Sequence, residues 1–486
     1  MKEVAGYLPG FSADEVEWQT LAFGRAGDRL EVAVPVLNEV QITQLAERVR
    51  VAGRSYLKTL SVAQITIIID RAIARLLDRD DPWRQKAERL LPLVTGYDAE
   101  MVRLGLTSYL KTFRRPELQK FLAEDFANPG VLDEFQPIPK GGFAKAFGPD
   151  LLLHIWAGNV PGLPLWSLIS GLLVKASTVG KLPSAEPLFA GWFAQLLVEI
   201  DPKLADCLAI VWWKGGDETQ EQAWLKQADV VVAYGGNRSL EAIRRRVPIT
   251  TRYLPYGHKI SFGMVSRTAL DPQKAWFVAH QAAYDVVRYD QQGCYSPHLF
   301  FVERGGRVSP QEFAGYLANE LACFERKFPR RPLSIEEAGS VAAWRNAEEM
   351  RSFAQPNREL MGDAMGAWSV AYVDADDDGE GLAPTGLNRT IKVIALDRLE
   401  DALPRIAPLR AFLQTVGIAG TPEELFQLAG LLGQAGVTRI CALGNMTAPE
   451  AGWHHDGRFN LLDLVAMTEI ERSAERAAER FASYVD

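Results

Sequence analysis

Residues Leu151–Asn159 read LLLHIWAGN, an apolar run that ends in glycine and asparagine. Short apolar runs bounded by turn residues are typical of buried strands. From this run onward, strand-like and helix-like patterns alternate: strand Leu151–Trp156, helix Pro164–Val174, strand Ala176–Leu182, helix Pro187–Ile200, strand Cys207–Trp213, helix Thr219–Gln227, strand Asp229–Tyr234 and helix Arg238–Arg246. This alternation predicts a parallel α/β sheet with right-handed crossovers.

Glycine follows two of these predicted strands. Gly158 and Asn159 follow the first, and Gly235, Gly236 and Asn237 follow the last. Ligands of open parallel sheets bind at the carboxyl ends of the strands, where glycine backbone and a helix N-terminus suit a phosphate. The dinucleotide fingerprint G-x-G-x-x-G is absent from the chain. The pattern alone therefore leaves a nucleotide site and a plain structural turn as equal alternatives.

A second stretch of interest is Tyr289–His298, YDQQGCYSPH, which places Cys294 on a Gly/Pro loop. A helix over Asp271–Arg288 and a strand over Leu299–Glu303 are predicted on either side. The predicted helix has an apolar face made of Trp276, Ala279, Ala283, Val286 and Val287. Loops between ordered elements often carry nucleophiles. A cysteine is nevertheless more often a small buried hydrophobic residue.

The remaining segments predict an N-terminal part, a second α/β unit and a C-terminal extension. The predicted N-terminal elements are strand 30–36 and helices near 39–52, 61–78, 84–94, 99–114 and 116–124, followed by a connector over 136–148. The predicted later elements are a helix capped at Ser309–Glu312, helices to about residue 353, strand 387–396, helix 423–434, strand 437–443 and a helical tail over 461–485. We predict the parts 1–145, 146–258, 259–444 and 445–486.

Composition narrows the class of protein. The chain has 486 residues, is 48% hydrophobic and carries a net charge of −8, which is ordinary for a globular protein of several domains and unsuited to nucleic-acid binding. Four scattered cysteines make neither a disulfide framework nor a zinc pattern, which suits the cytoplasm. The N-terminus does not resemble a signal peptide. The apolar segment Leu163–Val174 is too short to span a bilayer.

Other candidate sites are weaker. An acidic loop at Asp374–Gly379 resembles the start of a calcium site, but Thr385 stands where a bidentate acid is needed, so we expect no metal there. His454 and His455 are interpreted as a hydrogen-bonded turn. His258 and His298 are candidate bases for Cys294, and neither establishes a thiol hydrolase.

Asn159 is open to two readings. It follows a predicted strand in an apolar setting, and its side-chain amide can donate to an oxyanion. On its own, a turn asparagine is the commoner interpretation.

Taken together, the motifs resemble the LuxC acyl-CoA reductase family, the fatty acid reductases of bacterial bioluminescence and their relatives in the aldehyde dehydrogenase superfamily. The matching stretches, in chain order, are His154–Pro161 (HIWAGNVP), Lys181–Pro187 (KLPSAEP), Tyr234–Asn237 (YGGN), Tyr256–Gly263 (YGHKISFG), Gln292–Pro297 (QGCYSP) and His455–Gly457 (HDG). Their order and spacing hold from about residue 90 to about residue 470.

The resemblance implies a fold and site residues. The implied fold is aldehyde-dehydrogenase-like: a Rossmann-type cofactor-binding domain, a catalytic α/β domain and an oligomerisation extension. Cys294 matches the nucleophile that takes the acyl group, and Asn159, with the Cys294 backbone N–H, matches the oxyanion donors. The implied cofactor-binding residues are Gly158, Lys181, Ser184, Gly235, Gly236 and Asn237.

Departures from the hydrolytic aldehyde dehydrogenases are informative. Those enzymes carry a glutamate four residues before the lysine of their E-L-G-G-K motif, and Pro255 stands at that place here. Water is then poorly activated, and an acyl-cysteine should persist for attack by hydride or a thiol. Ser184 stands where NAD-preferring relatives often carry glutamate, which favours NADPH, with NADH as the alternative. The second cofactor-ribose glutamate, of an E-x-F-G-P motif, is not visible before Ile391.

The resemblance implies NADPH-dependent reduction of an acyl-CoA or acyl-protein thioester to a fatty aldehyde. It also implies a homo-oligomer and an acyl-protein synthetase as partner. The alternatives are a CoA-acylating aldehyde dehydrogenase that works oxidatively, a cysteine-dependent acyltransferase or thioesterase without nicotinamide, and a non-catalytic scaffold.

Overall fold

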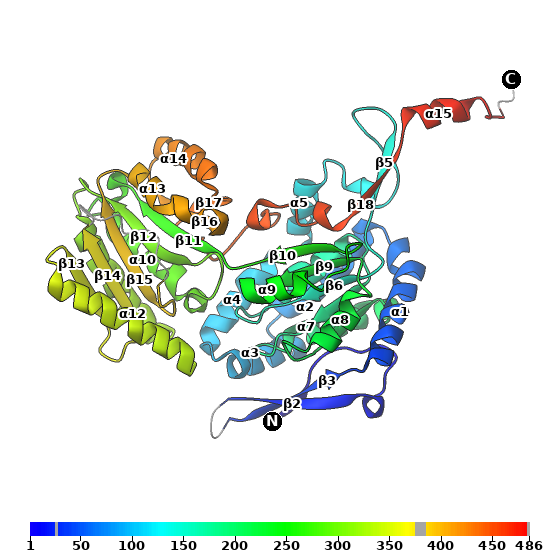
Figure 1. Cartoon of the computed structure of the whole chain (residues 1–486), viewed down its shortest axis with the longest axis horizontal. Helices are drawn as coiled ribbons and strands as arrows, with labels where there is room; N and C mark the ends of the chain where they lie inside the picture. The colour runs from blue at the N-terminus through cyan, green and yellow to red at the C-terminus, as the bar shows by residue number, and fades with distance from the viewer. Residues whose placement is uncertain (25–27, 375–384, 484–486) are drawn as a thin grey trace. The chain divides into compact units, whose positions relative to one another are not determined.

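The chain forms two units, each built on its own parallel sheet. The computed structural model describes residues 1–24, 28–374 and 385–483. Unit 1 consists of Met1–Val94, Leu106–Gly257 and Glu450–Asp486, and unit 2 of Thr95–Gly105 and His258–Pro449. Figure 1 follows the chain through both units by colour. Residues 375–379 of the acidic loop lie outside the described residues.

The sheet of unit 1 has five parallel strands in the order β10-β9-β6-β7-β8. The strands are β6 (Leu152–Ile155), β7 (Thr178–Lys181), β8 (Leu208–Val211), β9 (Val230–Tyr234) and β10 (Arg252–Tyr256). The four strands predicted here are confirmed, whereas β10 was not predicted. The chain leaves β6 toward β7 on one side and reaches β9 on the other, so the order reverses between β6 and β9. Crevices form at such switch points, outside the carboxyl ends of the strands.

Helices cover both faces of this sheet (Figure 1). Ile42 and Leu45 pack with Leu153 and Val179 in one buried cluster. The helices on this face are α1 (Glu39–Ser55), α8 (Glu218–Leu225) and α9 (Asn237–Arg244). Because side chains alternate along a strand, His154 faces the opposite side, where it lies against Gly171. Helices α6 (Pro164–Leu173), α7 (Phe189–Ile200) and α2 (Val62–Leu77) cover that side.

The remaining predicted N-terminal helices are confirmed as α3 (Pro82–Thr95), α4 (Ala99–Lys111) and α5 (Arg115–Asp125). An N-terminal sheet has the strand order β1-β3-β2, with β1 (Lys2–Val4), β2 (Glu17–Phe23) and β3 (Leu30–Val36). Only β3 was predicted, because it alone is mostly buried, whereas β2 is exposed or half-buried throughout.

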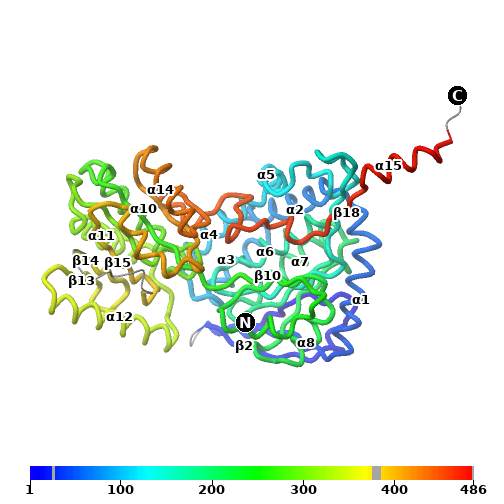
Figure 2. The backbone as a smooth tube through the Cα atoms, turned by 45° about the horizontal axis from the view of Figure 1, so that its top comes forward, coloured from blue at the N-terminus to red at the C-terminus, as the bar shows by residue number. Residues whose placement is uncertain are grey.

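Two predictions for unit 1 were wrong. The segment predicted as a connector contains β4 (Gln136–Pro137) and β5 (Phe143–Phe147), and the tail predicted as helical contains β18 (Ala466–Ile470) before α15 (Arg472–Glu479). Strand β18 pairs antiparallel with β5, more than three hundred residues earlier in the chain. Sequence periodicity is local and cannot reveal such a partner. Figure 2 shows the C-terminal segment as the red end of the tube, with α15 last.

The sheet of unit 2 has seven strands in the order β13-β14-β15-β12-β11-β16-β17. Strand β13 is antiparallel to β14, and the other neighbours are parallel. The strands are β11 (Ile260–Val265), β12 (Pro297–Glu303), β13 (Arg358–Gly362), β14 (Ser369–Asp374), β15 (Thr390–Leu396), β16 (Leu413–Ala419) and β17 (Arg439–Ala442). The predictions of β12, β15 and β17 are confirmed.

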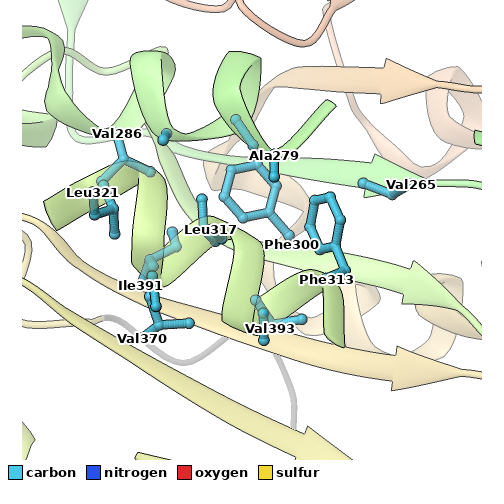
Figure 3. Packing of buried hydrophobic residues seen from close by; sticks show 14 of the residues in the cluster. Val265, Ala279, Val286, Phe300, Phe313, Leu317, Leu321, Val370, Ile391 and Val393 are labelled. Atoms are coloured by element: carbon cyan, nitrogen blue, oxygen red, sulfur yellow. The ribbon is translucent and has the colours of Figure 1, made fainter. Parts of the chain in front are cut away.

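One face of this sheet is covered by α10 (Ala275–Val287) and α11 (Pro310–Lys327). Figure 3 shows Ala279 and Val286 of α10 and Leu317 of α11 packed over Phe300 and Ile391. The predicted capping box at Ser309 is confirmed. Trp276 was wrongly placed on the buried face, since it is 54% exposed.

The other face of the unit 2 sheet packs against α13 (Leu403–Ile406) and α14 (Pro422–Ala435), whose Ile406 and Leu432 are buried with Phe262 and Phe301. Helix α12 (Ile335–Ala354) precedes β13. Strands β11 and β12 therefore lie in the middle of a sheet that is buried on both sides, next to the loop that carries Cys294.

Candidate active site

Cys294 lies in a tight turn between the end of α10 and the start of β12. The Ser296 N–H donates to the carbonyl of Gly293 at 3.0 Å, and the Ser261 hydroxyl donates to the carbonyl of Cys294 at 2.8 Å. A Cβ on Gly293 would lie 2.3 Å from the ring of Tyr295, so the turn needs glycine there. Cys294 itself is half-buried.

Two left-handed backbone runs meet just before this turn. Tyr289, Asp290 and Gln291 have φ of 54°, 49° and 61°, and the run 387–389 is also left-handed. Such conformations are costly for residues other than glycine, so the surroundings must fix them. The Arg389 guanidinium donates to the Asp290 carboxylate at 2.6 Å, and both side chains are almost completely buried.

The side chain of Gln291 ties the same two segments together. Its amide nitrogen donates to the carbonyls of Pro297 and Thr390 at 2.8 and 3.1 Å, and its oxygen accepts from the Arg389 N–H at 2.7 Å. The turn that bears Cys294 is therefore fixed on both sides by buried polar contacts. The sequence pointed to Gln291 only as a flanking residue, and the role of Arg389 was missed.

The sulfur of Cys294 contacts a residue that was not predicted. The side-chain nitrogen of Gln414, on β16, lies 3.4 Å from Cys294 Sγ, within hydrogen-bonding distance for sulfur. Gln414 is fully buried. An amide side chain within the mostly apolar stretch Leu413–Ala419 was the one signal that could have pointed to it.

The two histidines considered as bases differ in environment. His298, on β12, is buried, and burial together with the neighbouring His258 lowers its pKa to about 4, so it is neutral at pH 7. The Nδ1 atom of His298 has no hydrogen-bond partner among the described residues. His258 is exposed, with its ring centre 6.2 Å from that of His298. His298 makes no hydrogen bond to the sulfur among the described contacts.

In unit 1, the predicted cofactor residues gather at the carboxyl edge of the sheet, after β6, β7 and β9. A Cβ on Gly158 would lie 3.0 Å from side-chain atoms of Pro183 and Ala185, so the two loops pack closely only because glycine is there. Asn159 is exposed on the first of these loops. Its role as an oxyanion donor stays a prediction.

Lys181 ends β7 and lies over the ring of Trp213, 5.7 Å from the ring centre. Burial lowers the pKa of its ammonium, against the opposing effect of Glu221. Burying a cation without a close counter-ion is costly, which favours an anion at this place. The Ser184 hydroxyl accepts a hydrogen bond from Trp212 Nε1 at 3.2 Å.

The turn after β9 is open around its two glycines. An added Cβ would meet nothing within 4 Å at Gly236, and only Ser239 at 4.0 Å at Gly235. Helix α9 begins at Asn237, so its N-terminal N–H groups follow directly. An open glycine backbone, a helix N-terminus and Lys181 fit the phosphates and ribose of a dinucleotide.

The C-terminal segment reaches this same edge. The rings of Tyr234, Tyr256 and His455 form a stack, with centres 4.9 Å apart for the tyrosines and 4.5 Å for Tyr256 and His455. The predicted turn at His454–Gly457 is confirmed, since the Gly457 N–H donates to the His454 carbonyl at 3.0 Å. Within residues 1–24, 28–374 and 385–483, no group of acidic, histidine and cysteine side chains could hold a metal ion.

Comparison with known proteins gives a family. The family model described as acyl-CoA reductase (LuxC) matches residues 57–467. The chain is 24% identical over 459 residues to a long-chain acyl-protein thioester reductase of Photorhabdus luminescens, covering 94% of this chain and 90% of that one. It is 22% identical over 451 residues to the protein of the same name from Vibrio harveyi, covering 91% and 88%.

Solved structures give the fold. Aldehyde dehydrogenase 21 from Physcomitrella patens, in complex with succinate, superposes with a TM-score of 0.74 at 12% identity and covers 96% of this chain and 98% of that one. An indole-3-acetaldehyde dehydrogenase of P. syringae, in complex with NAD+, gives a TM-score of 0.73 at 15% identity, with 96% of each chain covered. The predicted aldehyde-dehydrogenase-like α/β fold is confirmed.

Proposed function

This chain belongs to the acyl-CoA reductase (LuxC) family, and we propose that it reduces a long-chain acyl thioester to an aldehyde through an acyl group carried on Cys294. The observation that carries this proposal is the setting of Cys294. The residue is half-buried and lies on a turn fixed by buried polar contacts, and its sulfur has an amide donor at 3.4 Å. A structural cysteine of the core needs none of these features.

The proposed chemistry uses the Cys294 sulfur twice. As a thiolate it attacks the acyl carbon, so that a new S–C bond forms and the carrier leaves as a thiolate. A reduced nicotinamide dinucleotide, when bound, supplies the hydride that reduces the acyl group. Once the acyl carbon is reduced, the thiohemiacetal loses its hydroxyl proton to solvent, its C–S bond breaks with the electron pair returning to Cys294, and the aldehyde leaves. We assign the oxyanion donors to Asn159 and the Cys294 backbone N–H.

We propose that Gly158, Lys181, Ser184, Gly235, Gly236 and Asn237 hold the dinucleotide, with the open turn at Gly236 under the pyrophosphate. Ser184 leaves room beside Lys181 for a 2′-phosphate, which supports NADPH over NADH. A glutamate at Ser184 would place a negative charge where that phosphate would lie.

The alternatives are less well supported. A thioesterase needs a base on the sulfur or on water, and His298 makes no hydrogen bond to Cys294 among the described contacts. Pro255, on β10, stands where hydrolytic relatives carry their glutamate. Both facts favour transfer of the acyl group to hydride or thiol over hydrolysis. A CoA-acylating aldehyde dehydrogenase that works oxidatively would use the same residues. Only the direction of turnover distinguishes it from the proposed reductase.

Several wider assignments belong to this proposal. Residues 1–145 and 146–258 bind the cofactor, 259–444 carry the catalytic cysteine and 445–486 serve an oligomeric assembly. The substrate is presented on coenzyme A or on a protein, with an acyl-protein synthetase as partner. The four cysteines, all of them in the described residues, are thiols outside any disulfide, which suits the cytoplasm. Within the described parts of the chain, no helix is both long and apolar enough to cross a bilayer.

The test is NADPH oxidation at 340 nm with a panel of acyl-CoAs, for the wild type and for Cys294→Ala. We expect oxidation that depends on the acyl-CoA, with aldehyde formed in proportion and neither reaction detectable in Cys294→Ala. Cys441→Ala is the matched control, since Cys441 is also half-buried in unit 2 but lies on β17. The same panel with NADH measures cofactor preference.

Two results would count against the proposal. Covalent acylation of Cys294 without NADPH or NADH oxidation would favour the acyltransferase. Equal oxidation in Cys294→Ala and the wild type would exclude Cys294 as the acyl carrier.

A further inference from the structure

Strands β16 and β12 both pair with β11, and each has an irregular register opposite the same part of β11. Between Ile260 and Phe262 on β11 there is one residue, Ser261, but between their partners Leu413 and Val416 on β16 there are two. A bulge of this kind in one strand turns a side chain away from its regular direction, and bulges are frequent next to active sites. Here the bulged residues are Gln414 and Thr415. Strand β12 has a similar extra residue after Pro297, opposite the same part of β11.

Ser261 connects this bulge to the Cys294 turn. Its hydroxyl accepts a hydrogen bond from the Thr415 N–H at 3.1 Å and donates one to the Cys294 carbonyl at 2.8 Å. All the atoms concerned belong to unit 2, and Ser261 and Thr415 are fully buried. The bulge therefore has a fixed position relative to the cysteine, and Ser261 is a positioning residue.

The Gln414 side chain is oriented by the same arrangement. Its oxygen accepts from the Thr415 hydroxyl at 3.4 Å, and its nitrogen lies 3.4 Å from Cys294 Sγ. A buried amide must find hydrogen-bond partners, because burying it unsatisfied costs free energy. A neutral thiol sulfur is a weak acceptor, whereas a thiolate is a strong one.

We infer that Gln414 is a catalytic residue that donates a hydrogen bond to the Cys294 sulfur whenever the sulfur carries negative charge. The chemical role rests on the proposed function. The sulfur is charged before it attacks the thioester, and it is charged again when the C–S bond of the thiohemiacetal breaks and the electron pair returns to it. In the acyl-cysteine the sulfur is a poor acceptor. The hydrogen bond thus favours formation of the nucleophile and departure of the sulfur from the aldehyde.

The test is the pH dependence of Cys294 alkylation by iodoacetamide in the full chain, followed by peptide mass spectrometry. In Gln414→Leu we expect the pH of half-maximal rate to rise by about one unit, a roughly tenfold loss of thiolate at pH 7. The rate at the high-pH plateau should rise about threefold, because a more basic thiolate is more nucleophilic. A merely structural role would not raise the plateau.

Controls separate this effect from general disturbance. Cys323 and Cys441 report on the same sample, and their profiles should not change. Gln427→Leu makes the same substitution on the exposed side of α14 and should leave the Cys294 profile as in the wild type. Gln414→Glu keeps the volume but adds a negative charge, so it should raise the half-maximal pH further, and it remains informative if Gln414→Leu does not fold.

An unchanged half-maximal pH in Gln414→Glu, or in a folded Gln414→Leu, would overturn the inference. The measurement needs neither thioester nor nicotinamide. A shift in the alkylation profile of a chain that reduces no acyl thioester would refute the proposed function alone and leave the Gln414 contact standing.

Discussion

Cys294 is positioned by contacts between segments that lie far apart in the sequence. Gly293 makes the turn. Gln291 fixes it by a contact with Thr390, 99 positions away, and Ser261 and Gln414 contact Cys294 from 33 and 120 positions away. These contacts are polar and buried, so each is strong when complete and costly when one partner is removed. Cys294 is thus held in place without relying on contacts of its own small side chain.

A residue-scale prediction concerns His298. Its pKa is lowered to about 4 by burial and by His258, whereas an unfolded histidine titrates near 6.5. Below pH 6.5 this histidine is protonated in the unfolded chain but still neutral in the folded chain. The free energy of unfolding therefore falls as the pH is lowered toward 4. We expect His298→Gln to weaken this dependence by up to about 3 kcal/mol between those pH values. Urea unfolding from pH 4 to 8 measures it.

The comparison at pH 8 is the control, because His298 is neutral there in both states and the variant then shows only the packing cost of the substitution. Parallel stability curves for the two chains across the whole range would contradict the prediction.

Sequence reasoning could single out only those candidate site residues that carry their own local signal. Cys294 stands out in a Gly/Pro loop, and Gly235 and Gly236 stand out after an apolar strand. Gln414 carries no such signal, because its direction depends on a bulge between β16 and β11, and a bulge is a property of two paired strands. Arg389 was missed for the same reason, since its partner Asp290 lies ninety-nine residues earlier in the chain.

At the scale of elements, prediction succeeded where an element is buried along one face or along its whole length. Helix α2 has a buried stripe and a capping box at Ser61, and the central strands β6 and β12 are mostly apolar and buried throughout. It failed for β5 and β18, which are short, partly exposed and stabilised by each other. Strand propensity depends strongly on such context.

An element-scale prediction concerns the two left-handed runs, 289–291 and 387–389. The ion pair between Asp290 and Arg389 is buried and holds one run against the other. Asp290→Ala should reduce the free energy of unfolding by about 3–5 kcal/mol, because it leaves a buried guanidinium without that partner. It should also lower the rate of Cys294 alkylation, since the turn loses its support. Urea unfolding and iodoacetamide labelling measure the two effects.

The double variant Asp290→Asn with Arg389→Met removes both the carboxylate and the guanidinium, so no buried charge is left unpaired. It should recover part of the stability that Asp290→Ala loses. Arg389 also pairs with Glu325 at 2.6 Å, so recovery should be incomplete. A single variant as stable as the wild type would show that the pair contributes no net stability.

At the scale of the whole molecule, the order of the chain does not follow the units. Residues 450–486 follow all of unit 2 in sequence but belong to unit 1. The Asp125 carboxylate accepts from the Leu462 N–H at 3.0 Å, and Arg252 donates to the carbonyls of Asp463 and Val465 at 2.7 and 2.8 Å. The fold of unit 1 is therefore complete only when the segment that begins at Glu450 has packed onto it.

Two truncations test this dependence. The chain ended after Glu471 loses α15, all of whose residues are exposed, and should unfold at the same urea concentration as the full chain. The chain ended after Pro449 also loses β18 and His455, which stacks on Tyr256. We expect unit 1 to lose at least about 3 kcal/mol of stability, from several hydrogen bonds and a buried ring. The freed edge of β5 should also promote aggregation. A chain ended after Pro449 that does not aggregate and unfolds at the same urea concentration as the full chain would mean that β18 and the aromatic stack add no stability to unit 1.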